Sequence, residues 1–176
     1  MSNRLKIAIS GKSGCGNTTV SRLLARRLGL RTINYTFHDM ARERGITFEE
    51  LCRLAEQDNQ YDLYLDRKQA ELAADGDCVL ASRLAIWLLK DAHLKVSLSA
   101  SAPVRAKRIA RREGIDGRRA LEELETRDGR DRNRYLKLYG IDIDAFRFAD
   151  LVVDTEEGDE HYVVETIVRK LEERRS

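Results

Sequence analysis

Short apolar runs alternate along this chain with longer segments whose apolar residues recur at helical spacing. The runs have the length of strands that are buried on both faces of a parallel sheet. They predict five strands, over residues 5–9, 31–36, 78–81, 95–100 and 151–153. Strands that alternate with helices in this way predict an α/β fold, in which helices cover both faces of a parallel sheet.

Helical spacing is clearest directly after the first run, where apolar residues recur from Val20 to Leu28 and Gly29 follows as a C-cap. Residues 37–74 are helical in pattern throughout. Thr47 and Glu50 predict a capping box there, and Asp58 predicts a break. A further helix is predicted from the turn that contains Pro103 to about residue 112. Two more are predicted over residues 118–139 and 163–171.

Composition indicates one globular domain, residues 1–176, because 42% of the residues are apolar and the length suffices for a core. Three cysteines, Cys15, Cys52 and Cys78, are odd in number and widely separated. They are interpreted as the reduced thiols of a cytoplasmic protein. The chain contains neither an apolar run of about 18 residues nor the apolar core of a signal peptide, so no membrane association is expected.

Charge is nearly balanced over the whole chain, at a net +2, which argues against nucleic acid as a partner. It is unevenly distributed, however. Residues 101–137 carry twelve Lys and Arg against seven Asp and Glu. This segment is therefore expected to face an anion.

The segment Ser10–Val20 matches a phosphate-binding loop at every position but one. That pattern requires Gly, four residues, Gly, Lys, and then Ser or Thr. Gly11, Gly16 and Thr18 satisfy it, whereas Asn17 stands in the place of the lysine. A strand before the glycines and a helix after them are the context that this motif requires.

Backbone N–H groups of such a loop surround a nucleotide phosphate, and the helix that follows adds its positive end. The hydroxyl of Thr18 is expected to bind Mg²⁺. Lys12 has two interpretations: it folds back over the phosphates and replaces the missing charge, or it points into solvent. The residues predicted to bind nucleotide are Gly11, Lys12, Ser13, Gly14, Cys15, Gly16, Asn17, Thr18 and Thr19.

A second constellation consists of Arg127, Asp131 and Arg134, whose spacing places them on one face of the long helix. The guanidinium group of an arginine can donate two parallel hydrogen bonds to phosphate oxygens. The carboxylate can orient a hydroxyl or an arginine. The alternative is a solvated face of ordinary ion pairs.

Three further arginines are candidates for phosphate binding. Arg83 follows the third strand at the edge where parallel sheets bind their ligands. Arg111 and Arg112 lie nearest to a connection bracketed by glycines, and they are predicted to belong to a lid over residues 111–134. Lys12, Arg111, Arg112 and Arg127 are the predicted catalytic residues.

With these pieces placed, the chain resembles the P-loop nucleoside monophosphate kinases, and most of all the cytidylate kinases of the short archaeal type. Besides the loop, the resemblance is carried by the segments 37–45, 54–58, 65–72, 127–134, 139–144 and 150–155. It implies transfer of a phosphoryl group from ATP to CMP or dCMP with Mg²⁺. It also implies a sheet in the order 2-3-1-4-5, a monophosphate-binding insertion at about 37–76, and substrate binding by Arg127, Asp131 and Arg134.

The chain departs from that family pattern at three places. Asn17 replaces the loop lysine, and Ala81-Ser82 replaces Glu-Gly before Arg83. His38 stands where an arginine usually binds the acceptor phosphate, and it is expected to bind substrate there in its protonated form. Two alternatives therefore remain beside a CMP kinase: a protein that binds nucleotide with weak or no turnover, and a kinase for another small acceptor. A monomer is expected, with a dimer that shares Lys12 between active sites as the alternative.

Overall fold

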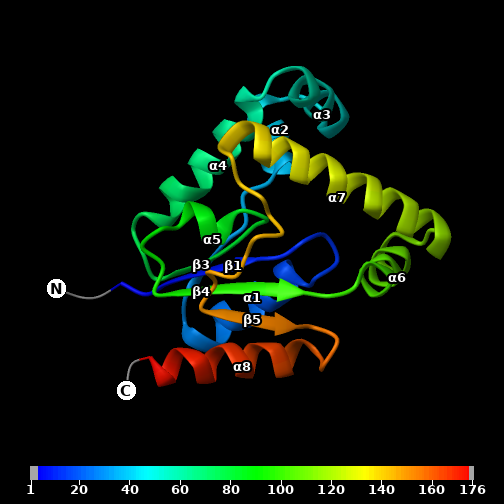
Figure 1. Cartoon of the computed structure of the whole chain (residues 1–176). Helices are drawn as coiled ribbons and strands as arrows, with labels where there is room; N and C mark the ends of the chain where they lie inside the picture. The colour runs from blue at the N-terminus through cyan, green and yellow to red at the C-terminus, as the bar shows by residue number, and fades with distance from the viewer. Residues whose placement is uncertain (1–3, 175–176) are drawn as a thin grey trace.

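The centre of the molecule is a five-stranded, entirely parallel sheet, seen in a computed structural model that describes residues 4–174 (Figure 1). The strands lie in the order β2-β3-β1-β4-β5, which confirms the predicted order. Their bounds are Lys6–Ser10 for β1, Arg31–Ile33 for β2, Cys78–Ala81 for β3, Leu94–Ser99 for β4 and Leu151–Asp154 for β5.

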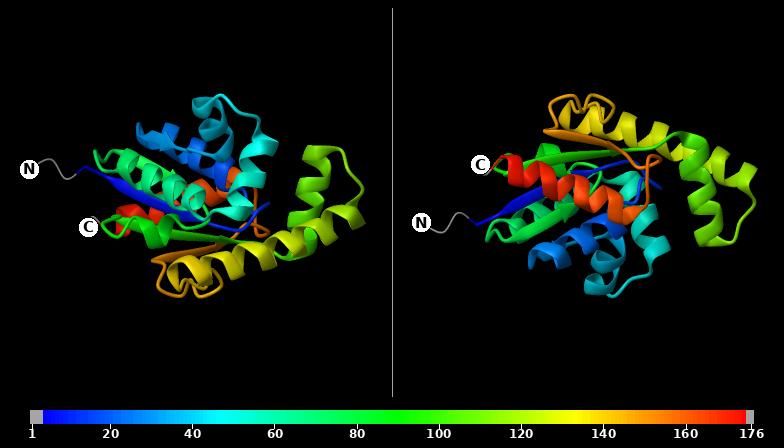
Figure 2. Two further views of the ribbon diagram at one scale, coloured as in Figure 1. Left: turned by 90° about the horizontal axis from the view of Figure 1, so that it is seen from above. Right: turned by 90° about the horizontal axis from the view of Figure 1, so that it is seen from below.

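Helices cover both faces of this sheet (Figure 2). On one face lie α1 (Asn17–Leu28) and α8 (Glu160–Glu173), whose apolar residues pack on the strands in one large cluster. The C-terminal part of α4 (Gln60–Ala73) and the short α5 (Ala85–Leu88) pack on the other face. The three-layer arrangement is the one predicted, although the sequence pattern did not predict α5.

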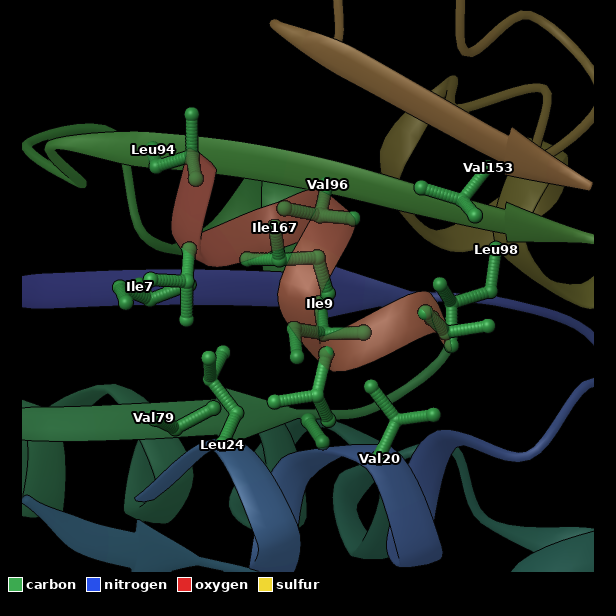
Figure 3. Close-up of a cluster of buried hydrophobic side chains, with 14 of the residues drawn as sticks. Ile7, Ile9, Val20, Leu24, Val79, Leu94, Val96, Leu98, Val153 and Ile167 are labelled. Carbon is green, nitrogen blue, oxygen red and sulfur yellow. The ribbon is translucent and has the colours of Figure 1, made fainter. Parts of the chain in front are cut away.

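The central strand β1 supplies side chains to both layers in alternation. Ile7 and Ile9 enter the cluster formed with α1 and α8, while Ala8 enters the cluster on the opposite face. All three side chains are completely buried, and Figure 3 shows Ile7 and Ile9 beside Leu24 and Val96. Burial on both faces explains why this strand is a continuous apolar run rather than an alternating one.

Three helices form an insertion between β2 and β3: α2 (Phe37–Arg44), α3 (Phe48–Gln57) and α4. It has a small apolar cluster of its own. A full capping box forms at Thr36 and Asp39, and Thr36 therefore starts α2. The prediction that this strand extends to residue 36 was therefore wrong, and β2 ends at Ile33. At the second cap, Thr47 accepts a hydrogen bond from the N–H of Glu50, which is one half of the capping box predicted there.

A helical hairpin follows β4, made of α6 (Ala102–Glu113) and α7 (Gly117–Tyr139). Gly114 ends α6 with a positive φ of 68°, which a glycine adopts without strain. In Figure 1, α7 runs from this turn back to the insertion. Within residues 4–174, no helix is both long and apolar enough to cross a membrane.

Leu24 provides a test of the core between α1 and the sheet, because its side chain is completely buried. Replacing Leu24 by Ala is expected to lower the free energy of unfolding by about 2–5 kcal/mol, since the cavity adds to the lost burial. Urea unfolding measures this change. Leu136→Ala on the exposed side of α7 is the matched control, with an expected loss of less than about 1 kcal/mol. Equal losses in both variants would contradict this description of the core.

Candidate functional site

A tight turn connects β1 to α1 and forms the base of the site. Gly14 and Gly16 have φ angles of 84° and 97°, so both positions favour glycine. The first turn of α1 contains no acidic residue, and no side chain caps its N-terminus in the described part of the chain. The N–H groups at this helix end are therefore available to an anion, as the sequence motif predicts.

The side chain of Asn17, which stands at the lysine position of the motif, bonds within the loop itself. Its Nδ2 donates a hydrogen bond of 2.6 Å to the carbonyl oxygen of Gly11, which closes the turn on itself. A side chain at position 11 would lie only 2.5 Å from Asn17 Oδ1, so this closure also requires glycine there. Asn17 has a structural role in the loop that the motif comparison did not reveal.

Lys12 projects from the same turn toward the segment after α7. Its Nζ lies 2.6 Å from Asp144 Oδ1, and about a third of its side chain is exposed. Lys12 and Asp144 both line a cavity of about 200 Å³ beside the loop. Among its other lining residues are Gly11, Arg83, Trp87 and Phe146. The lysine is thus anchored beside the loop within its own chain rather than free in solvent.

Two arginines of α6 hold the loop from behind. Arg105 Nη1 donates to the carbonyl oxygen of Ser13 at 3.2 Å, and Arg108 Nη1 donates to that of Gly14 at 3.1 Å. Arg105 is buried and forms an ion pair of 2.7 Å with Asp128 of α7. Distance from the glycine-bracketed connection favoured Arg111 and Arg112 over these two arginines, and only the packing of α6 on the loop distinguishes Arg105 and Arg108.

The pair predicted for the lid, Arg111 and Arg112, lies in the last turn of α6 and is exposed. Arg112 pairs with the adjacent Glu113. Neither arginine contacts the loop in the described structure. Their assignment to a lid remains a prediction.

Arg83, Asp131 and Arg134 form one connected group above the loop. Arg83 donates to Ser13 Oγ at 2.5 Å, and its Nε lies 2.5 Å from Asp131 Oδ2. The other oxygen of Asp131 accepts from Arg134 at 3.1 Å. Asp131 is buried, so these three residues are not a solvated face of surface ion pairs. The structure thus brings together three residues that the sequence predicted to bind substrate.

The other two predicted substrate-binding residues lie apart from this group. Arg127 is exposed one turn earlier on α7. His38 is exposed in the first turn of α2, where its ring stacks on Phe48 with centroids 3.8 Å apart. Whether Arg127 and His38 contact an acceptor remains a prediction.

Two buried carboxylates of α4 complete the site, and the sequence interpretation did not include them. Asp62 Oδ1 lies 3.5 Å from Arg134 Nη1, and Asp66 Oδ2 accepts a hydrogen bond of 2.5 Å from the hydroxyl of Tyr139. The available signal was their spacing, because Asp62, Asp66 and Gln69 share one helix face that is buried. Burial raises the pKa of both carboxyl groups, that of Asp66 to about 6.

Comparison with known proteins gives a consistent result. The model of the cytidylate kinase-like family matches residues 6–157. A relative named cytidylate kinase 2, from Borrelia garinii subsp. bavariensis, is 47% identical over 97% of this chain and 98% of its own. Another, named cytidylate kinase, from Pyrococcus horikoshii, is 41% identical over 87% of this chain and 81% of its own. The solved structure of shikimate kinase from Bacteroides thetaiotaomicron covers 96% of both chains with a TM-score of 0.63 and 16% identity, and so shares the fold.

The raised pKa of Asp66 predicts how stability changes with pH. Burial raises this pKa from its ordinary value of 3.8 to about 6, while the Tyr139 hydrogen bond acts against the rise. Between about pH 4 and pH 6 the folded protein keeps a proton that the unfolded chain releases. The contribution of Asp66 to the free energy of unfolding therefore falls as pH rises through this window, by about 2–3 kcal/mol in total.

Urea unfolding at a series of pH values tests this for the unchanged protein and for Asp66→Asn, which keeps an acceptor for Tyr139. The free energy of unfolding of the unchanged protein minus that of the variant should fall from pH 4 to pH 6. A difference that is constant or rises with pH would show that the pKa of Asp66 is not raised.

Proposed function

The chain belongs to the cytidylate kinase-like family, and we propose that it transfers the γ-phosphoryl group of ATP to CMP or dCMP. The observation that carries this proposal is the bond from Arg83 to Ser13, which joins the phosphate-binding loop to the group of Arg83, Asp131 and Arg134. A donor phosphate on the loop would thereby lie beside an acceptor phosphate at Arg83.

In the proposed reaction, a phosphate oxygen of the acceptor attacks the γ-phosphorus while the bond to the β,γ-bridging oxygen breaks and ADP leaves. Such transfers depend on positioning and on charge rather than on a covalent intermediate. The loop N–H groups hold the donor, Arg83 holds the acceptor phosphate, and Asp131 with Arg134 holds the sugar. Arg111, Arg112 and Arg127 are exposed and are proposed to reach the phosphates when the lid over 111–134 closes.

The proposed metal is Mg²⁺, with Thr18 as its one protein ligand. Thr18 is exposed in the first turn of α1 and suits an ion that also binds phosphate oxygens. No group of three His, Cys, Asp or Glu within residues 4–174 could hold a metal without the nucleotide. When bound, the ion offsets negative charge on the phosphates during transfer.

Lys12 is proposed to supply the charge that Asn17 lacks. Its anchoring by Asp144 keeps the ammonium beside the loop, and the lysine stem is flexible enough to exchange that carboxylate for a phosphate. The proposed role needs only this chain, with a dimer that shares Lys12 between active sites as the alternative.

A panel of acceptors tests the proposed function. With ATP and Mg²⁺, CMP and dCMP are expected to be converted to diphosphates faster than UMP, AMP or GMP, as measured by ADP release and by chromatography of the products. Binding of ATP and CMP without any product, at high enzyme concentration, would instead favour a nucleotide-binding protein. Turnover with a different acceptor would support kinase activity and would reject CMP and dCMP as the substrates.

Replacing Lys12 by Met tests the source of the charge, because methionine keeps most of the stem and removes the ammonium. We expect kcat to fall about 100-fold, the usual loss for one preorganised charged group. Asn17→Lys in the Lys12→Met background should restore part of that loss. Lys107→Met, an exposed lysine of α6, is the control and should leave kcat within about twofold. If Lys12→Met changes kcat no more than this control, Lys12 does not carry the missing charge.

A further inference from the structure

Charges alternate in a line from the loop to the insertion. It begins where Arg83 bonds Ser13 of the loop, continues through Asp131 to Arg134 of α7, and ends at Asp62 of α4. Successive side-chain atoms along the line lie 2.5–3.5 Å apart. Figure 1 shows the elements involved: α7 reaches from the lid to the insertion, where it lies close to α4.

A nucleoside monophosphate has the same linear order of parts: phosphate, sugar and base. The proposed function, on which this inference rests, assigns the phosphate to Arg83 and the sugar to Asp131 with Arg134. The base then lies at the far end of the line, toward α4. Asp62 is the ionisable side chain of α4 that the line reaches.

Asp62 also has unused hydrogen-bonding capacity. Its side chain is buried, with only 3% of the residue exposed. One carboxylate oxygen lies near Arg134, but the other, Oδ2, has no hydrogen-bond partner among residues 4–174. Arg134 Nε, on the neighbouring side chain, is buried and without a partner in the same described region. A buried polar atom without a partner is costly, and two on adjacent side chains suit a polar ligand that bonds both.

We propose that Asp62 recognises the base of the acceptor, its Oδ2 accepting a hydrogen bond from the 4-amino group of cytosine. Uracil carries an oxygen in place of that amino group. Two acceptors would then face each other in a buried position, and neither could be satisfied. Asp62 is thus the residue that separates CMP from UMP.

The surroundings of Asp62 fit this role in two ways. Arg134 fixes one oxygen of the carboxylate and leaves the other free for the base. Burial raises the pKa of Asp62, which the charge of Arg134 opposes. The charge of Arg134 favours the ionised carboxylate, which is the form that accepts a hydrogen bond from the amino group.

The test compares kcat/KM for CMP and UMP in the unchanged protein and in Asp62→Asn. An amide presents both a donor and an acceptor, and it can turn over to pair with either base. We expect the CMP-to-UMP ratio of kcat/KM to fall on the order of ten- to a hundredfold, through a loss with CMP and a gain with UMP. Glu71→Gln, the same acid-to-amide change on the exposed side of α4, is the matched control and should keep the ratio of the unchanged protein.

A second variant, Asp62→Glu, keeps the charge and moves the carboxylate by one methylene. It should raise KM for CMP without raising kcat/KM for UMP. It remains informative if circular dichroism shows that Asp62→Asn does not fold. An unchanged ratio in folded Asp62→Asn, or an equal change in the Glu71→Gln control, would overturn the assignment of Asp62.

Calorimetric binding of CMP and UMP separates this outcome from a failure of the proposed function. If no monophosphate is phosphorylated by the unchanged protein, the proposed function fails. The binding preference for CMP over UMP, and its loss in Asp62→Asn, would still decide the role of Asp62.

Discussion

The buried guanidinium of Arg105 joins three parts of the molecule that are distant in sequence. It donates to the carbonyl oxygens of Ala100, after β4, and of Ser13, in the loop, and it pairs with Asp128 on α7. Taking this charge out of water is costly, and the cost is offset only because all these partners are present together. The shape of the loop, the end of β4 and the position of α7 therefore depend on one another.

The long helix α7 extends this dependence across the whole site. Near Asp128 it is tied to the back of the loop, and one turn later Asp131 pairs with Arg83, in front of the loop. Arg134 then reaches α4 of the insertion. A shift of this one helix would move the residues proposed to hold the donor and those proposed to hold the acceptor together, which suits a reaction that must bring two phosphates into line.

Local pattern was sufficient for most of the fold and for part of the site. Apolar runs located the strands to within a few residues, and the glycine spacing located the loop. Arg83 was identified from its place at a strand end, and Asp131 with Arg134 from helical spacing. Each of these inferences uses residues close in sequence, where strand and helix periodicity determines which side chains share a face.

The sequence by itself determined an α/β fold with a phosphate-binding loop that lacks its lysine, because motif spacing and periodicity are local properties. Only the structure showed that Asn17 closes the loop, that Lys12 is anchored by Asp144, and that Asp62 is buried beside Arg134. The partners of Lys12 and Asp62 meet them only because the loop after β1, helix α4 and the C-terminal part of α7 with the segment after it are brought together in the folded chain. Which buried carboxylate meets which cation depends on that packing, which no local pattern encodes.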